Sequence, residues 1–94
     1  MIKYAAIKCP DGTVISGEDL VGYPTRTNPR HHDIINFMVE IIGYKEPIGG
    51  KYIQGFVTND GIFVNRIKGA QIALASKQIE FLRWSPNLYS EDLW

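Results

Sequence analysis

The sequence YIQGFVTNDGIFVN, residues 52–65, holds two apolar runs separated by a short polar turn. Residues Tyr52–Thr58 and Ile62–Asn65 are rich in aromatic and β-branched side chains, which favour β-strands. The segment Asn59-Asp60-Gly61 between them is typical of a tight hairpin, because Asp-Gly tolerates the positive φ that such turns require. These residues therefore predict an antiparallel β-hairpin.

Two helices are predicted on either side of this hairpin in the chain. The second runs from Arg66 to about Ser76, with Asn65 as its N-cap. The first runs from Pro29 or Arg30 to Ile42, where apolar residues recur at three- and four-residue spacing. We expect Asn28 to cap the first helix, with Pro29 in its first turn and Gly43 at its end.

The apolar face of each helix is expected to pack on the sheet. By its spacing, the first helix buries Ile34, Ile35, Met38, Ile41 and Ile42. The second buries Ile67, Ala70 and Leu74. Gly69 is expected to weaken the second helix by about 1 kcal/mol relative to alanine.

Another hairpin and an apolar tail complete the predicted domain. Strands at Tyr4–Lys8 and Thr13–Ser16 flank a turn at Cys9–Gly12, and loops are expected at Gly17–Pro29 and Glu46–Gly50. The residues after Lys77 carry more apolar surface than a protein leaves in water, so we expect them to pack on the domain or on a partner subunit. The sequence thus predicts one α+β domain over residues 1–94, with two hairpins in a mainly antiparallel sheet, two helices and an aromatic C-terminal tail.

The composition narrows the classes of function. Ten basic residues balance ten acidic ones, which counts against general nucleic-acid binding. A single cysteine forms no intrachain disulfide. The apolar stretch from Ile34 to Ile42 is about half as long as the roughly 20 residues of a membrane-spanning helix, so we expect no membrane association.

A basic cluster precedes the first predicted helix. Arg26, Arg30, His31 and His32 fall within seven positions, at a helix start whose free N–H groups also favour anions. Guanidinium and imidazole donors there predict a site for a phosphate group. The candidate ligand-binding residues are Arg26, Arg30, His31, His32, Arg66, Thr25 and Tyr23.

Two other interpretations of this cluster stay open. His31 shares the spacing of Ile35 and Met38, so it is also placed to lie on the core face, and the arginines are placed to pair with Asp33 or Glu40. A metal site is disfavoured because adjacent histidines point about 100° apart on a helix, whereas helical metal pairs favour i, i+4 spacing. We therefore predict no metal ligands, no cofactor and no catalytic residues.

Three segments resemble a family of small bacteriophage proteins. They are Gln54–Arg66, which continues through Ala70 to Ile79, the block Arg30–Ile35, and the ending Leu88–Trp94 with the sequence LYSEDLW. The chain departs from that pattern at Lys68, where the family has an acid, and at Lys77, where a glycine commonly ends the helix.

The resemblance implies a phage origin and expression in the host bacterial cytoplasm. By analogy with other small phage proteins, it also implies a counter-defence role. The first hypothesis is a homo-oligomeric sponge that sequesters a cyclic or ADP-ribose-type immune nucleotide without cleaving it. The alternatives are a protein–protein inhibitor that docks on a bacterial defence enzyme through the aromatic tail, and a small phosphohydrolase or nuclease that uses His31 or His32.

Overall fold

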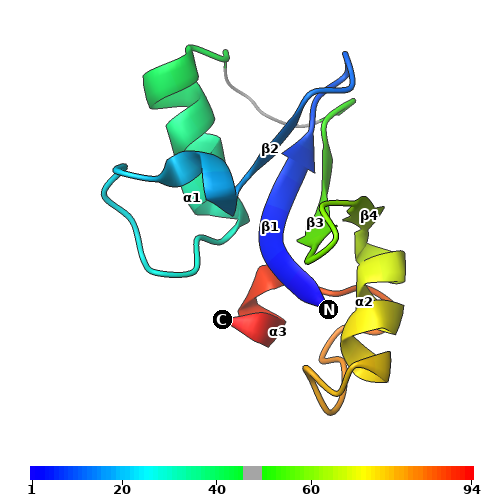
Figure 1. The fold of residues 1–94 in the computed structure, drawn as a ribbon. Coiled ribbons are helices and arrows are strands. Elements are labelled where there is room, and N and C mark those ends of the chain that lie inside the picture. Colours follow the sequence, from blue (N-terminus) through cyan, green and yellow to red (C-terminus); the bar gives the residue numbers. More distant parts are fainter. Residues whose placement is uncertain (46–49) are drawn as a thin grey trace.

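Four strands form one antiparallel sheet in the computed structural model, which describes residues 1–45 and 50–94 (Figure 1). The strand order is β2-β1-β3-β4. The strands are β1 (Ile2–Lys8), β2 (Val14–Ser16), β3 (Ile53–Thr58) and β4 (Phe63–Asn65). This α+β architecture and both hairpins agree with the sequence prediction, whereas the central pairing of β1 with β3 joins segments about fifty residues apart.

Both hairpin turns form where Asp-Gly occurs in the sequence. In the first, the N–H of Gly12 donates to the carbonyl of Cys9 at 2.9 Å, and the φ of Gly12 is +94°. In the second, the N–H of Gly61 donates to the carbonyl of Thr58 at 2.9 Å, and the φ of Gly61 is +81°. An L-residue rarely adopts either conformation, so each glycine fixes the position of its turn.

The first helix consists of α1 (His31–Phe37), which continues into one π-helical segment, η2 (Met38–Ile42). It reaches Ile42 as predicted, and Gly43 ends it with a φ of +95°. The predicted start is wrong by one to two residues. Arg30 is the N-cap, rather than Asn28, because the Asp33 carboxylate accepts from the Arg30 N–H at 2.9 Å.

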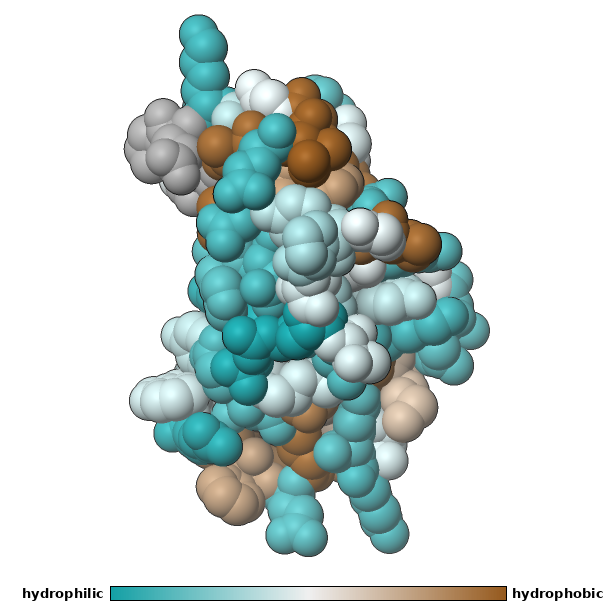
Figure 2. Space-filling view, turned by 90° about the vertical axis from the view of Figure 1, so that its left-hand side faces the viewer, coloured by the Kyte–Doolittle hydropathy of each residue, from teal (hydrophilic) through white to brown (hydrophobic). Residues whose placement is uncertain are grey.

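The π-helical turn also changes which apolar side chains are buried. Ile34 and Met38 are fully buried, but Ile41 and Ile42 are 62% and 47% exposed, against the prediction. The N–H of Gly43 bonds to the carbonyl of Met38, five residues earlier, and this wider turn breaks the α-helical spacing on which the prediction rested. Hydrophobic side chains accordingly gather at the upper end of the face shown in Figure 2, over η2.

The second helix, α2 (Arg66–Ala75), has the predicted cap, since the Asn65 side chain accepts from the Lys68 N–H at 2.8 Å. Its predicted buried face is correct only at Ala70. The exposed fractions of Ile67 and Leu74 are 47% and 39%, and the small residues Gly69, Ala70 and Ala73 face the sheet instead.

Gly69 explains this close approach of α2 to the sheet. A Cβ at that position would lie only 3.1 Å from the Phe56 ring. Gly69 therefore lets α2 pack on β3, which offsets its low helix propensity.

The C-terminal segment packs on the domain as predicted, in part. Leu88 is fully buried, and α3 (Ser90–Leu93) lies between the starts of α1 and α2 (Figure 1). Phe81 and Trp84, in contrast, are 70% and 53% exposed. One buried cluster joins side chains of the sheet, both long helices and Leu88.

Two further points concern the segments between elements. The loop predicted at Gly17–Pro29 begins with a short 3-10 helix, η1 (Gly17–Leu20), and the first four residues of the connection predicted at Glu46–Gly50 lie outside the described residues. Among the helices of residues 1–45 and 50–94, none has the length and apolar character needed to cross a bilayer.

Candidate functional site

The His31 side chain lies inside the protein, in the core position that the sequence left open. Its exposed fraction is 6%, and its ring packs edge-on against Phe56 at a centroid distance of 5.2 Å. Nε2 lies 2.7 Å from the carbonyl oxygen of Gly55, and Nδ1 lies 3.2 Å from the Ser90 hydroxyl. A carbonyl only accepts, so Nε2 carries the proton and Nδ1 accepts from Ser90.

This environment favours the neutral imidazole. Burial lowers the pKa of His31, and the charge of Arg66 lowers it further, whereas the hydrogen bond to Gly55 opposes the shift. Both ring nitrogens are engaged within the fold, so the imidazole has no donor left for a ligand while α3 stays in place.

The guanidinium groups of Arg30 and Arg66 also hold the C-terminal segment. Arg30 donates to the main-chain oxygen of Trp94. Arg66 donates to the side-chain oxygen of Gln54 and lies over the Tyr89 ring, 4.5 Å from its centroid. Of the open alternatives for Arg30, pairing with Asp33 or Glu40 is not the one observed, since its guanidinium contacts Trp94 instead.

Two segments of family-like sequence thus meet in space. Residues 30–31 belong to one of the family-like blocks and residues 88–94 form the family-like ending, and together with Arg66 they form one set of contacts between α1, α2 and α3. These contacts give Arg30, His31 and Arg66 a structural role. Ligand binding by these three residues stays a prediction.

Asp33 contacts the two remaining members of the basic cluster, Arg26 and His32. Its carboxylate lies 3.2 Å from Nε of Arg26 and 3.3 Å from Nε2 of His32. The side chains of Arg26 and His32 are substantially exposed, at 44% and 58%, whereas that of Asp33 is 14% exposed. Pairing of Arg26 with Asp33 was one of the alternatives left open by the sequence, and the structure shows this pair.

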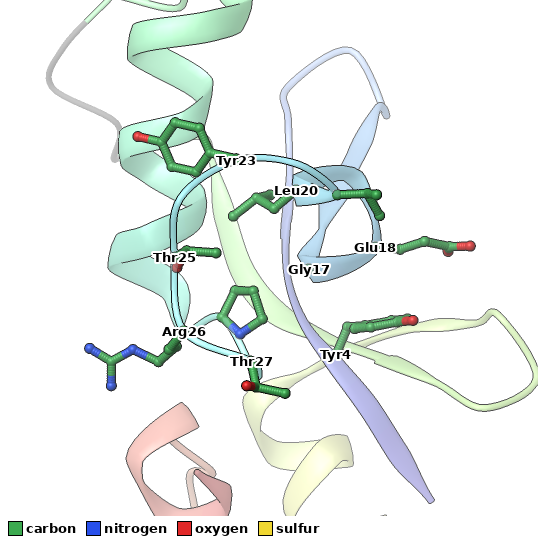
Figure 3. A pocket seen from close by; sticks show the side chains of 10 residues that line it. Tyr4, Gly17, Glu18, Leu20, Tyr23, Thr25, Arg26 and Thr27 are labelled. Carbon is green, nitrogen blue, oxygen red and sulfur yellow. The ribbon is translucent and has the colours of Figure 1, made fainter.

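A pocket of about 280 Å³ lies under the segment that joins η1 to α1, and we call it the loop pocket (Figure 3). Three of the predicted residues line it, namely Tyr23, Thr25 and Arg26. Its other lining residues are Tyr4, Gly17, Glu18, Leu20, Val21, Thr27 and Pro29.

The side chains of the loop pocket come from two sides. Figure 3 shows Thr25 and Arg26 on one side and Tyr4 and Glu18 on the other, with the Arg26 guanidinium extending outward at the rim. The Tyr23 hydroxyl donates to Glu40 at 2.6 Å, and this hydrogen bond raises the pKa of Tyr23.

Local capping fixes the wall of the loop pocket at η1. The Ser16 hydroxyl accepts from the Glu18 N–H at 3.2 Å, and the Asp19 carboxylate accepts from the Ser16 N–H at 2.8 Å. This reciprocal pattern is a capping box, which fixes the direction in which the chain leaves β2. Gly17 then packs against the Tyr4 ring, where an added Cβ would lie 3.0 Å from Cδ1.

A family model described as phage T4 y16D protein matches residues 1–94. The chain belongs to the phage T4 y16D protein family. The resemblance to small phage proteins is thereby confirmed, and so is the phage origin that it implied. No curated protein and no solved structure matches the chain.

In this y16D family chain, sequence reasoning missed Tyr4, Gly17 and Glu18 as pocket residues. The signal available was the spacing of Ser16 and Asp19, which is the sequence signature of a capping box. A metal site has no support in geometry, since within the described ranges no three His, Cys, Asp or Glu side chains gather closely enough to share an ion.

Proposed function

We propose that this phage protein binds a phosphate-bearing nucleotide in the loop pocket and sequesters it without cleavage. The observation that carries the proposal is the lining of that pocket, which contains two threonines and two tyrosines and has the Arg26 guanidinium at its rim. The ligand class is a cyclic or ADP-ribose-type immune nucleotide, and the role is counter-defence in the host bacterial cytoplasm.

The chemistry of the lining suits the two parts of a nucleotide. Arg26 contacts Asp33 through Nε, and its two Nη groups are further donors that suit phosphate oxygens. The half-buried ring of Tyr4 offers a face on which a base stacks. Nanomolar affinity corresponds to about −12 kcal/mol, and charge-assisted hydrogen bonds and stacking supply this together once the pocket is closed by a second copy.

Binding without turnover fits the positions of the histidines. The loop pocket, whose lining lies wholly in the described part of the chain, has no histidine in its wall. His31 is buried with both nitrogens engaged. This placement disfavours the phosphohydrolase or nuclease hypothesis, in which a histidine acts as acid or base.

A homo-oligomer would close the loop pocket. Val21 is 89% exposed and Ile41 is 62% exposed, and both line an adjoining apolar pocket with Phe37. A second copy covering these side chains removes apolar surface from water beside the ligand. Light scattering on the native protein and on the Val21→Ser, Ile41→Ser double variant tests this part, and a monomeric native protein would contradict it.

Titration calorimetry against a panel of cyclic nucleotides and ADP-ribose derivatives tests the binding itself. We expect at least one ligand to bind, and Arg26→Ala to weaken it at least tenfold. Arg83→Ala is the matched control, because Arg83 is also an exposed arginine near a carboxylate but lies outside the loop pocket. Mass spectrometry of the heat-released ligand distinguishes sequestration, which returns it intact, from cleavage.

A second candidate function is inhibition of a bacterial defence enzyme, and the exposure of Phe81 and Trp84 favours it. Truncation after Pro86 is unsuitable as a test because it removes the buried residues Leu88 and Ser90. The Phe81→Ser, Trp84→Ser double variant keeps the core. Loss of enzyme inhibition in this variant, with an unchanged circular dichroism spectrum, would support the inhibitor over the sponge.

A further inference from the structure

A second pocket adjoins the loop pocket at the Tyr4 and Glu18 side chains. This hairpin pocket, also of about 280 Å³, is lined by Lys3, Tyr4, Glu18 and residues 57–61 of the β3–β4 hairpin. Tyr4 and Glu18 line both pockets. We call the two pockets together the Tyr4 groove.

A β-bulge and a glycine build the middle of this groove. The pairing of β1 with β3 shifts register between Ile2 and Tyr4, and such bulges re-aim the side chains next to them. Exposed Lys3 lies here with its Nζ 5.4 Å from the centroid of the Tyr4 ring. Gly17, which has no Cβ, lets η1 approach the same ring.

The size of the Tyr4 groove indicates a ligand with two halves. Pockets that enclose small molecules have volumes of about 300–1,000 Å³. Each pocket alone lies just below that range, and the two together lie within it. A ligand that fills only one pocket leaves the lining of the other pocket in water.

The charges of the Tyr4 groove indicate few phosphates on that ligand. Arg26 lies in the loop pocket and Lys3 in the hairpin pocket, so each half has one cation. Glu18 and Asp60 are also in the lining, and they repel a highly charged polyphosphate. Their carboxylates accept from sugar hydroxyls and base amino groups instead.

We infer that the ligand is a dinucleotide, with two nucleosides joined through one phosphodiester or pyrophosphate linkage and one half in each pocket. The inference rests on the proposed nucleotide-binding function and names its substrate class. In the bound state the Tyr4 ring lies between the two halves of the ligand. Arg26 and Lys3 contact the linking phosphate or the sugars next to it, and the Glu18 carboxylate accepts hydrogen bonds from sugar hydroxyls.

Calorimetry with matched probes tests the dinucleotide class. The probes are ApA, CpC, GpG, UpU and NAD as dinucleotides, the four corresponding 5′-monophosphates, and ATP and GTP. We expect at least one dinucleotide to bind at least tenfold more tightly than any monophosphate or triphosphate. Lys3→Ala should weaken that dinucleotide at least tenfold and leave any weak monophosphate binding within twofold.

Lys8→Ala is the matched control for Lys3→Ala. Lys8 is an exposed lysine of the same strand whose Nζ lies 5.9 Å from an aromatic centroid, that of Phe63, but it lines neither pocket. Equal binding by Lys3→Ala and Lys8→Ala, or monophosphates that bind as tightly as dinucleotides, would overturn the dinucleotide inference and leave the proposed function standing. If no nucleotide of either panel binds, both fail.

Discussion

Because the His31 imidazole is buried, we predict that the free energy of unfolding depends on pH. The substitution His31→Gln isolates the part of this dependence that comes from His31. Glutamine keeps a donor and an acceptor at the end of its side chain but does not titrate. The comparison of native protein with His31→Gln therefore separates the effect of protonation from the effect of the hydrogen bonds.

The sign of the pH dependence follows from burial. The folded-state pKa of His31 lies below its ordinary value of about 6.5, chiefly because the ring is desolvated. Below pH 6.5 the unfolded chain takes up a proton that the folded protein resists. The free energy of unfolding therefore falls as the pH falls from about 6.5 towards the folded-state pKa, and this contribution is fully present only above pH 6.5.

The size of this pH effect on the free energy of unfolding is limited, because only one proton is involved. A single titrating group changes the free energy of unfolding by at most about 1.4 kcal/mol per pH unit. A domain of this length has a total stability of roughly 5–14 kcal/mol, so two pH units remove a measurable share. Replacement by alanine is a harsher change and costs about 3–5 kcal/mol, because the Gly55 carbonyl and the Ser90 hydroxyl both lose their contact with the imidazole, although the Ser90 hydroxyl keeps its contacts with the main-chain N–H of residue 31 and with Glu91.

Urea denaturation between pH 5 and pH 7.5, followed by far-UV circular dichroism, measures both effects. The native protein should lose more stability than His31→Gln on acidification, while the carboxylates contribute equally to both curves. His32→Gln is the control, because its imidazole is exposed. Parallel pH profiles for native protein and His31→Gln would refute the argument that burial keeps His31 neutral.

Three further predictions concern the backbone of α2 and use thermal unfolding as the measurement. Lys77 has a φ of +60°, so Lys77→Gly should raise the free energy of unfolding by about 1 kcal/mol, and a lower melting temperature would contradict this reading of the helix end. Gly69→Ala should destabilise the protein by about 1–3 kcal/mol despite alanine's better helix propensity, because the new Cβ would lie 3.1 Å from the fully buried Phe56 ring. A stabilised variant would show that the ring moves aside without cost. Asn65→Ala removes the cap bond to the Lys68 N–H and should cost about 1 kcal/mol, whereas Asn59→Ala in the exposed hairpin should cost less.

The sequence predicted best those features that neighbouring residues determine. The Asp-Gly turns, the Asn65 cap and the end of the first helix at Gly43 each depend on a few adjacent residues, and all three are confirmed. Lys77 was singled out in the sequence as standing where a glycine commonly ends a helix, and its positive φ supplies the physical reason.

Features that depend on distant segments were not predictable in the same way. The burial of Ile41 and Ile42 was predicted wrongly because a π-helical turn interrupts the α-helical spacing. The spacing of the apolar residues alone does not indicate such a turn. The face of α2 was predicted wrongly because the sheet selects small residues for close packing. The loop pocket forms from β1, η1 and the following loop, which only the tertiary fold brings together.

The contacts of the basic cluster direct the search for ligand-binding residues away from the start of α1 and towards the Tyr4 groove. Arg30, His31 and Arg66 hold the segment Leu88–Trp94, so the requirements of folding already account for the residue types that looked most like a phosphate site. Lys3, Glu18 and Arg26 differ, because their side chains are exposed and line the Tyr4 groove. Arg26 pairs with Asp33 and Lys3 lies near the Tyr4 ring, but such exposed contacts contribute only about 0–1 kcal/mol, so the substitutions at Arg26 and Lys3 test function with little effect on stability.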